Sequence, residues 1–153
     1  MAICLQIFVI LKWSRCKKLK DMFKIDQIKS AHSKVKSGAD YPAYVQELIK
    51  IGVIGYETYV SDGNTTYFGA NHYRIESGPK YDALVVSENS DTAAFKRDLK
   101  AHQEGKTNFP RFCLDAARSG VEKWVVSMDV MTCTYLDKNG QILVTESIPG
   151  DAH

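Results

Sequence analysis

The sequence lacks the short motifs that identify the commonest nucleotide-binding and hydrolytic families. It contains no Gly-x-Gly-x-x-Gly, no Walker loop, no Gly-x-Ser-x-Gly elbow and no His-Glu-x-x-His. These absences exclude the commonest nucleotide-binding and hydrolase classes, and they leave other kinds of enzyme open.

Cysteine is scarce, and its spacing does not suit a metal. The 4 cysteines include no Cys-x-x-Cys pair, and no cysteine–histidine spacing resembles a zinc site. We therefore expect no metal site and no cofactor. Cys113 and Cys133 are expected to be buried apolar residues in a reducing compartment.

No apolar run is long enough to cross a membrane. The run from Ile3 to Leu11 falls well short of the roughly 20 residues that a spanning helix needs. Basic residues follow this run, whereas a secretory signal has its positive charge first. We expect residues 1–21 to be a non-native or disordered extension before a natural start at Met22, with no stable membrane insertion. Contact with an anionic membrane surface is the alternative.

Positive charge is concentrated in the same first 21 residues. They hold 5 of the 20 lysines and arginines, so the rest of the chain has 15 basic and 17 acidic residues. Nucleic-acid binding normally needs a clustered basic face, and none is evident. We expect residues 22–153 to form a single cytoplasmic domain without a nucleic-acid partner.

What the sequence does contain is an internal repeat at an offset of 68 residues. Tyr41-Pro42-Ala43-Tyr44-Val45 is echoed by Phe109-Pro110-Arg111-Phe112-Cys113. At the same offset the matching pairs are Gly52 with Gly120, Tyr56 with Trp124 and Tyr67 with Tyr135. Such self-similarity predicts two copies of one unit related by a pseudo-twofold axis. Good helix-capping chemistry that arose twice is the alternative.

Hydrophobic periodicity and capping signals predict two helices followed by an antiparallel meander in each half. The expected helices cover residues 25–35, 40–51, 91–102 and 108–120, and the expected strands cover 53–60, 65–70, 73–76, 83–86, 123–128, 132–136 and 141–148. The predicted fold class is α+β, with two similar halves forming one two-layer domain by internal duplication. The side chains expected at the helix–sheet interface are Tyr44, Leu48, Tyr56, Phe95, Leu99, Phe112, Val121, Trp124 and Val126.

Two histidines occupy similar places near the ends of the first helix of each half. If a twofold axis relates the halves, His32 and His102 could face one cleft. Histidine titrates near neutrality and is the commonest acid–base group. The alternative is that each residue is placed for a favourable interaction with the helix dipole.

A second group of candidate residues lies on and beside the first hairpin. Its members are Glu57, Tyr59, Asp62, Tyr67, Asn71 and His72, and all of them except Asp62 are candidate ligand-binding residues. A carboxylate near tyrosines and a histidine could bind a polar ligand or assist a proton transfer. The second half carries Val125 and Ser127 where the first carries Glu57 and Tyr59, so this site would be asymmetric. The alternative is a strand with one solvated face.

From Met22 onward the sequence resembles the YbcV-like family of small bacterial and prophage proteins. The segments that carry the resemblance are residues 28–40, 56–60, 67–71, 100–103, 120–126 and 131–135. The family is a domain of unknown function, and some members carry the label phage envelope protein. The resemblance implies no catalytic residue.

Three functions are compatible with these observations. The leading interpretation is a bacterial or prophage domain that binds a small polar ligand or a protein partner without catalysis. The first alternative is an enzyme that acts on a small polar substrate in a cleft between the halves. The second is a component of a phage particle.

Overall fold

The structure is a computed structural model that describes residues 22–36 and 38–150. The expectations for residues 1–21 lie outside the described residues. None of the helices within the described ranges is long and apolar enough to span a membrane.

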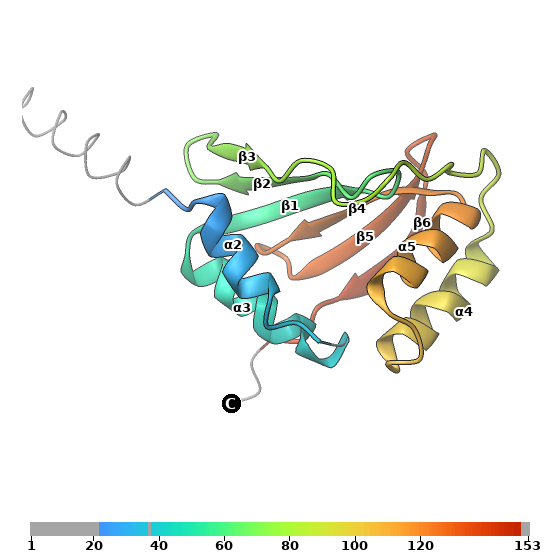
Figure 1. The fold of residues 1–153 in the computed structure, drawn as a ribbon, viewed down its shortest axis with the longest axis horizontal. Coiled ribbons are helices and arrows are strands. Elements are labelled where there is room, and N and C mark those ends of the chain that lie inside the picture. Colours follow the sequence, from blue (N-terminus) through green and yellow to red (C-terminus); the bar gives the residue numbers. More distant parts are fainter. Residues whose placement is uncertain (1–21, 37, 151–153) are drawn as a thin grey trace, which may run out of the picture.

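Each half of the chain forms two helices and then three strands (Figure 1). The first half contains α2 (Ile25–His32), η1 (Gly38–Asp40), α3 (Tyr41–Lys50), β1 (Val53–Tyr59), β2 (Thr65–Gly69) and β3 (Arg74–Glu76). The second half contains α4 (Thr92–Gln103), α5 (Phe109–Arg118), β4 (Val121–Ser127), β5 (Thr132–Asp137) and β6 (Ile142–Ser147). The α+β class and the order of elements in both halves are confirmed.

The prediction of a strand at residues 83–86 is wrong. This stretch belongs to the connection between the halves, which has no regular structure there. The Leu84 amide donates to the Ser61 carbonyl after β1, and the Ser87 amide donates to the Ala117 carbonyl of α5. Neither bond belongs to a strand ladder, because Ser61 lies in the turn after β1 and Ala117 lies in a helix, so the segment is not paired with a strand.

Side-chain caps and glycines set the ends of the helices. Asp91 Oδ1 accepts from the Ala94 amide at 2.9 Å, and Asn108 Oδ1 accepts from the Arg111 amide at 3.0 Å, which begins α4 and α5. Gly52 and Gly120 follow the last turns of α3 and α5 with φ of 102° and 81°. Side chains rarely adopt such φ values, so glycine ends both helices at matching positions.

The six strands form one antiparallel sheet in the order β3-β2-β1-β4-β5-β6. The strand pairing repeats at the sequence offset: Tyr56 pairs with Tyr67 in β1–β2, and Trp124 pairs with Tyr135 in β4–β5. The register of both hairpins shifts at the same place, between Val53 and Gly55 and between Val121 and Lys123.

The pseudo-twofold axis passes between the two central strands. Glu57 of β1 pairs with Val125 of β4, and these two residues are also equivalent in the repeat. An antiparallel pair whose partners are each other's equivalents lies on the axis that exchanges the halves. The duplicated architecture follows from this register as well as from the sequence.

The four α-helices of the described residues lie across one face of the sheet, as α2 with α3 and as α4 with α5 (Figure 1). The core lies between the helices and this face. The nine side chains expected there are all buried, and Trp124 is the most exposed of them at 7%. Cys113 and Cys133 are also buried, and both are free thiols.

Candidate functional site

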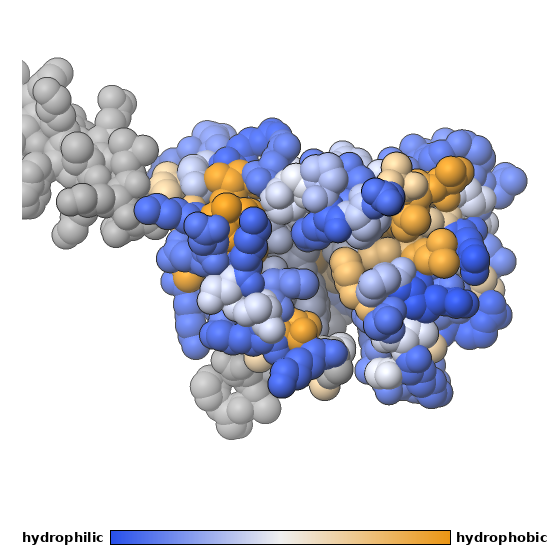
Figure 2. All heavy atoms as spheres, in the orientation of Figure 1, coloured by the Kyte–Doolittle hydropathy of each residue, from blue (hydrophilic) through white to orange (hydrophobic). Residues whose placement is uncertain are grey.

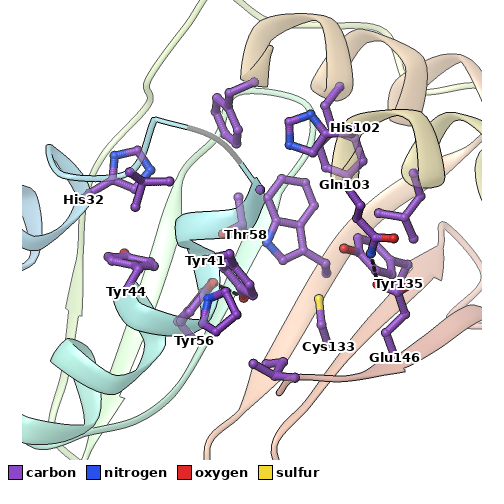
Figure 3. A pocket seen from close by; sticks show the side chains of 18 of the residues that line it. His32, Tyr41, Tyr44, Tyr56, Thr58, His102, Gln103, Cys133, Tyr135 and Glu146 are labelled. Carbon is purple, nitrogen blue, oxygen red and sulfur yellow. Dashed lines mark hydrogen bonds between the residues drawn. The ribbon is translucent and has the colours of Figure 1, made fainter. Parts of the chain in front are cut away.

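A cavity of about 410 Å³ opens between the two helix pairs and reaches down to the sheet. Figure 2 shows the surface hollowed between the two pairs, and Figure 3 shows side chains from both halves pointing into the space. The side chains of the floor come from four strands: Tyr56, Thr58, Tyr67, Trp124, Cys133 and Tyr135. The principal ring side chains of the walls are His32, Tyr41, Tyr44, His102, Phe109 and Phe112.

The floor consists of two rows that run across the strands. In the first row Thr58 pairs with Thr65 on one side and with Trp124 on the other, and Trp124 pairs with Tyr135. In the second row Tyr67, Tyr56, Val126 and Cys133 follow one another in the same way. The pseudo-twofold axis exchanges the rows, so each large aromatic pair lies diagonally opposite the other.

The two halves supply chemically different surfaces to this cavity. The repeat offset places Phe109 where the first half has Tyr41, Phe112 where it has Tyr44, and Trp124 where it has Tyr56. Cys133 and Val126 likewise replace Thr65 and Thr58. The first half therefore contributes hydroxyl groups, and the second half contributes mainly apolar rings. A symmetric scaffold thus encloses an amphipathic cavity.

The tyrosine hydroxyls of the first half are paired with each other. The Tyr41 and Tyr56 oxygens lie 2.6 Å apart, and a hydrogen bond between the Tyr44 and Tyr67 hydroxyls affects the pKa of both groups. Burial raises the pKa of all four phenols, so they stay protonated at neutral pH. The Tyr41–Tyr56 pair uses one of its two protons internally and keeps one to donate to a ligand.

His32 and His102 stand on opposite walls and pack against equivalent rings. The His32 ring lies 5.4 Å from the Tyr44 ring, and the His102 ring stacks on Phe112 at 4.5 Å. Burial lowers the pKa of both imidazoles, and the nearby Lys80 ammonium lowers the pKa of His32 further. Both imidazoles are therefore neutral near pH 7.

One nitrogen of His102 is committed to the loop after α4. Its Nδ1 lies 3.1 Å from the Thr107 carbonyl oxygen and 3.2 Å from the Thr107 hydroxyl. A carbonyl can only accept, so the bond to it assigns the proton to Nδ1. Nε2 is then the free acceptor of this ring.

Lys80 brings a positive charge to the first-half side of the cavity. Its Nζ donates to Thr65 Oγ1 at 3.0 Å, and that oxygen lies 2.8 Å from Thr58 Oγ1 in the floor. Lys80 is exposed as a residue, but its ammonium group lies against the buried Thr65. Loss of hydration around the ammonium lowers the pKa of Lys80.

The opposite side of the cavity carries a carboxylate and a buried thiol. Glu146 of β6 pairs with Cys133 in the sheet and accepts a hydrogen bond from Gln103 Nε2 at 2.7 Å. Burial raises the pKa of the Cys133 thiol to about 12, so it is not an activated nucleophile. The cavity therefore has the positive charge of Lys80 on one side and the negative charge of Glu146 on the other.

Of the seven candidate residues from the sequence, His32, Tyr67 and His102 line the cavity. Glu57 and Tyr59 lie on the other face of the sheet, where Lys123 Nζ is 3.3 Å from Glu57 Oε2 and 5.4 Å from the centre of the Tyr59 ring. Asn71 and His72 are exposed in the β2–β3 turn with positive φ. The structure thus brings together three of the seven residues and separates the other four from them.

The sequence reasoning missed several residues that shape this cavity. Tyr41 and Tyr56 follow the ordinary patterns of a helix and a strand, and only comparison of the two halves marks them as positions where the first half alone has a hydroxyl group. Lys80 carried no signal, because it lies in a loop without a repeat partner. Among residues 22–36 and 38–150, no group of three histidine, cysteine or acidic side chains could hold a metal ion.

Comparison with known proteins places the chain in a family. Residues 29–147 match the family described as "Protein of unknown function (DUF1398)", and the chain belongs to it. The chain is also similar to uncharacterized proteins of Mycobacterium bovis and Mycobacterium tuberculosis, at 34% identity over 76 residues. These matches cover 45% of this chain and 46% of each relative, so the similarity spans about half the length of the curated relatives.

Proposed function

We propose that this protein binds a small amphipathic molecule in the cavity between its two halves. The observation that carries the proposal is the chemical asymmetry of the cavity, where tyrosine hydroxyls face phenylalanine and tryptophan rings. Its volume of about 410 Å³ falls within the range of about 300–1,000 Å³ typical of small-molecule sites. Neutral hydroxyls that keep a free proton suit hydrogen bonding to a ligand.

Binding of the neutral probe 1-naphthylacetamide to the full chain, followed by isothermal titration calorimetry, tests this proposal. His32 stands at the wall between the rings of Tyr44 and Phe109. His32→Trp should therefore obstruct the cavity and weaken binding by about tenfold or more. The matched control is Lys29→Trp, which places the same side chain on an exposed position of α2 outside the cavity. Equal binding by both variants would contradict the proposal.

A second candidate function is an enzyme that uses a cavity histidine as a base. The observation that favours it is the neutral His102, with Nδ1 bonded to Thr107 and Nε2 left to accept a proton. If the protein is such an enzyme, His102→Gln should abolish turnover of its substrate and should leave the binding of 1-naphthylacetamide intact. Turnover unaffected by this substitution would exclude His102 as the base.

The narrower expectations from sequence stay proposals. They are the resemblance to the YbcV-like proteins, a bacterial or prophage origin and a cytoplasmic location. A role in a phage particle also stays a proposal.

A further inference from the structure

We propose that the ligand of this cavity is a small carboxylate with an aromatic body, and that Lys80 binds its carboxylate. This inference rests on the proposed function and names the class of molecule that the cavity takes. Three features carry it: a cation without an acidic partner, the direction of charge across the cavity, and the rings beside the cation.

Lys80 lines the cavity as a cation with unused donors. Within the described part of the chain, no carboxylate forms an ion pair with it. The one described hydrogen bond of its ammonium group goes to Thr65 Oγ1 and uses one of the three ammonium protons. Two protons remain for a carboxylate, and hydrogen bonds between charged groups are the stronger kind.

The surroundings of Lys80 are suited to an anion and not to a second cation. Thr65 donates its own proton to the Gly63 carbonyl at 3.1 Å, so its oxygen accepts from both Lys80 and Thr58. Glu146 lies at the other end of the second floor row and is occupied by Gln103. An anion is therefore attracted to the Lys80 side and repelled from the Glu146 side.

The other charged and titratable side chains that line the cavity do not change this direction. His32 and His102 are neutral near pH 7 because burial lowers the pKa of each. Lys36 lines the cavity as a second cation, and it is exposed. Lys80 is exposed as a residue too, but the hydrogen bond of its ammonium group to the buried Thr65 holds its charge beside the floor of the cavity, so Lys80 is the cation assigned to the carboxylate.

The aromatic body of the ligand is inferred from the cluster of aromatic rings that lies beside Lys80 in the cavity. Thr58, which is bonded to Thr65, pairs across the sheet with Trp124. The Trp124 ring centre lies 5.8 Å from that of Phe112, 6.2 Å from that of Tyr135 and 6.5 Å from that of Phe109. A ring bound against this cluster would place a substituent carboxylate toward Thr58 and Lys80, and bare inorganic anions would leave the cluster uncovered.

The test compares three probes by titration calorimetry at pH 7.5: 1-naphthylacetate, its neutral analogue 1-naphthylacetamide, and acetate. We expect the naphthyl acid to bind about tenfold or more tightly than the amide, which is the ratio for one charge-assisted contact, and acetate to bind far more weakly than either. Lys80→Met should remove the preference for the acid and leave the affinity for the amide nearly unchanged. Lys50→Met, which removes an equal charge from the exposed end of α3, should leave the preference intact.

The outcomes separate this inference from the proposed function. Equal affinity of wild type for acid and amide would overturn the carboxylate inference and leave small-molecule binding standing. A preference for the acid that survives Lys80→Met but is lost in Lys36→Met would overturn the assignment to Lys80. Binding of neither naphthyl probe would overturn both proposals. Thermal melting of each variant in the absence of probe would show whether Lys80→Met is folded.

Discussion

At the scale of single residues, the hydroxyl pair of Tyr41 and Tyr56 shows how burial makes two similar groups unequal. Tyr56 is buried at 5% exposure, whereas Tyr41 is only partly buried and lines the cavity. The described hydrogen bond of each hydroxyl is the one to the other, at 2.6 Å. Removing one of the two hydroxyl groups leaves the other without this hydrogen bond, either in the core for Tyr56 or at the cavity for Tyr41.

This inequality gives a prediction about two conservative substitutions. Tyr41→Phe leaves the buried Tyr56 hydroxyl without its partner and should lower the free energy of unfolding by about 1–3 kcal/mol. Tyr56→Phe leaves the Tyr41 hydroxyl at the cavity, where water can replace the bond, and should cost only about 0.5–1.5 kcal/mol. Urea denaturation of both variants measures the difference. A larger loss for Tyr56→Phe would show that the Tyr41 hydroxyl is the one shielded from water.

Trp124 combines a place in the core with a place in the cavity. It is 7% exposed and contacts the rings of Phe109, Phe112 and Tyr135. Trp124→Ala should lower the free energy of unfolding by about 3–5 kcal/mol, because it removes buried area and leaves a void. The control is Val125→Ala on the other sheet face, which should cost clearly less because Val125 is partly exposed. An unchanged denaturant midpoint for Trp124→Ala would refute its place in the core.

At the scale of elements, α3 and α5 both end at a glycine with positive φ, but the two glycines lie in different surroundings. A Cβ on Gly120 would lie 2.8 Å from the Asn89 carbonyl oxygen, whereas a Cβ on Gly52 would meet only the Phe23 ring, at 4.0 Å. Both positions have positive φ. The connection between the halves therefore packs against the end of α5 and not against the end of α3.

The matched pair Gly52→Ala and Gly120→Ala separates backbone strain from steric conflict. Gly52→Ala should cost about 1–2 kcal/mol, the penalty of a left-handed backbone for a residue with a Cβ. Gly120→Ala should cost more, because the backbone of Asn89 and Ser90 must also move. Thermal or urea denaturation of the two variants tests the order. Equal losses of unfolding free energy in the two variants would mean that the backbone of the connection shifts to accommodate the Cβ at no energetic cost.

At the scale of the whole molecule, each half places one imidazole on the wall of the shared cavity, His32 on one side and His102 on the other. The pKa values of His32 and His102 are lowered from 6.5 by burial. The unfolded chain therefore binds more protons than the folded protein in the range just below the unfolded pKa. The contribution of the neutral imidazoles to stability is present above pH 6.5 and is lost as the pH falls through the folded pKa values.

This linkage predicts a stability profile. The free energy of unfolding from urea titrations should decrease between pH 7 and pH 5.5. The double variant His32→Gln/His102→Gln should show a flatter profile over the same range, because its side chains do not titrate. A wild-type profile that rises on acidification would mean that the folded protein favours the charged imidazoles.

Much of the fold could be predicted from local chemistry. Cap residues such as Asn108, glycines such as Gly120, and the alternation that buries Tyr56 and exposes part of Glu57 are properties of short segments. The repeat offset also indicated which residues are equivalent, because an antiparallel pair of copies must share a register. The prediction of a strand at 83–86 is wrong because Val85 and Val86 suit a strand, whereas the Leu84 amide bonds to Ser61 in the turn after β1 and not to a neighbouring strand.

The cavity depended on facts that no local pattern contains. Glu57 and Tyr67 are near each other across the first hairpin, yet the pleat directs them to opposite faces of the sheet, and only the helices on one face turn that face into a site. Lys80 reaches Thr65 because the connection between the halves folds back over the first hairpin. Local sequence thus determined the elements and their pairing, since capping and alternation act over a few residues. Long-range packing alone decided which side chains share the cavity, since their proximity arises only when the two halves meet.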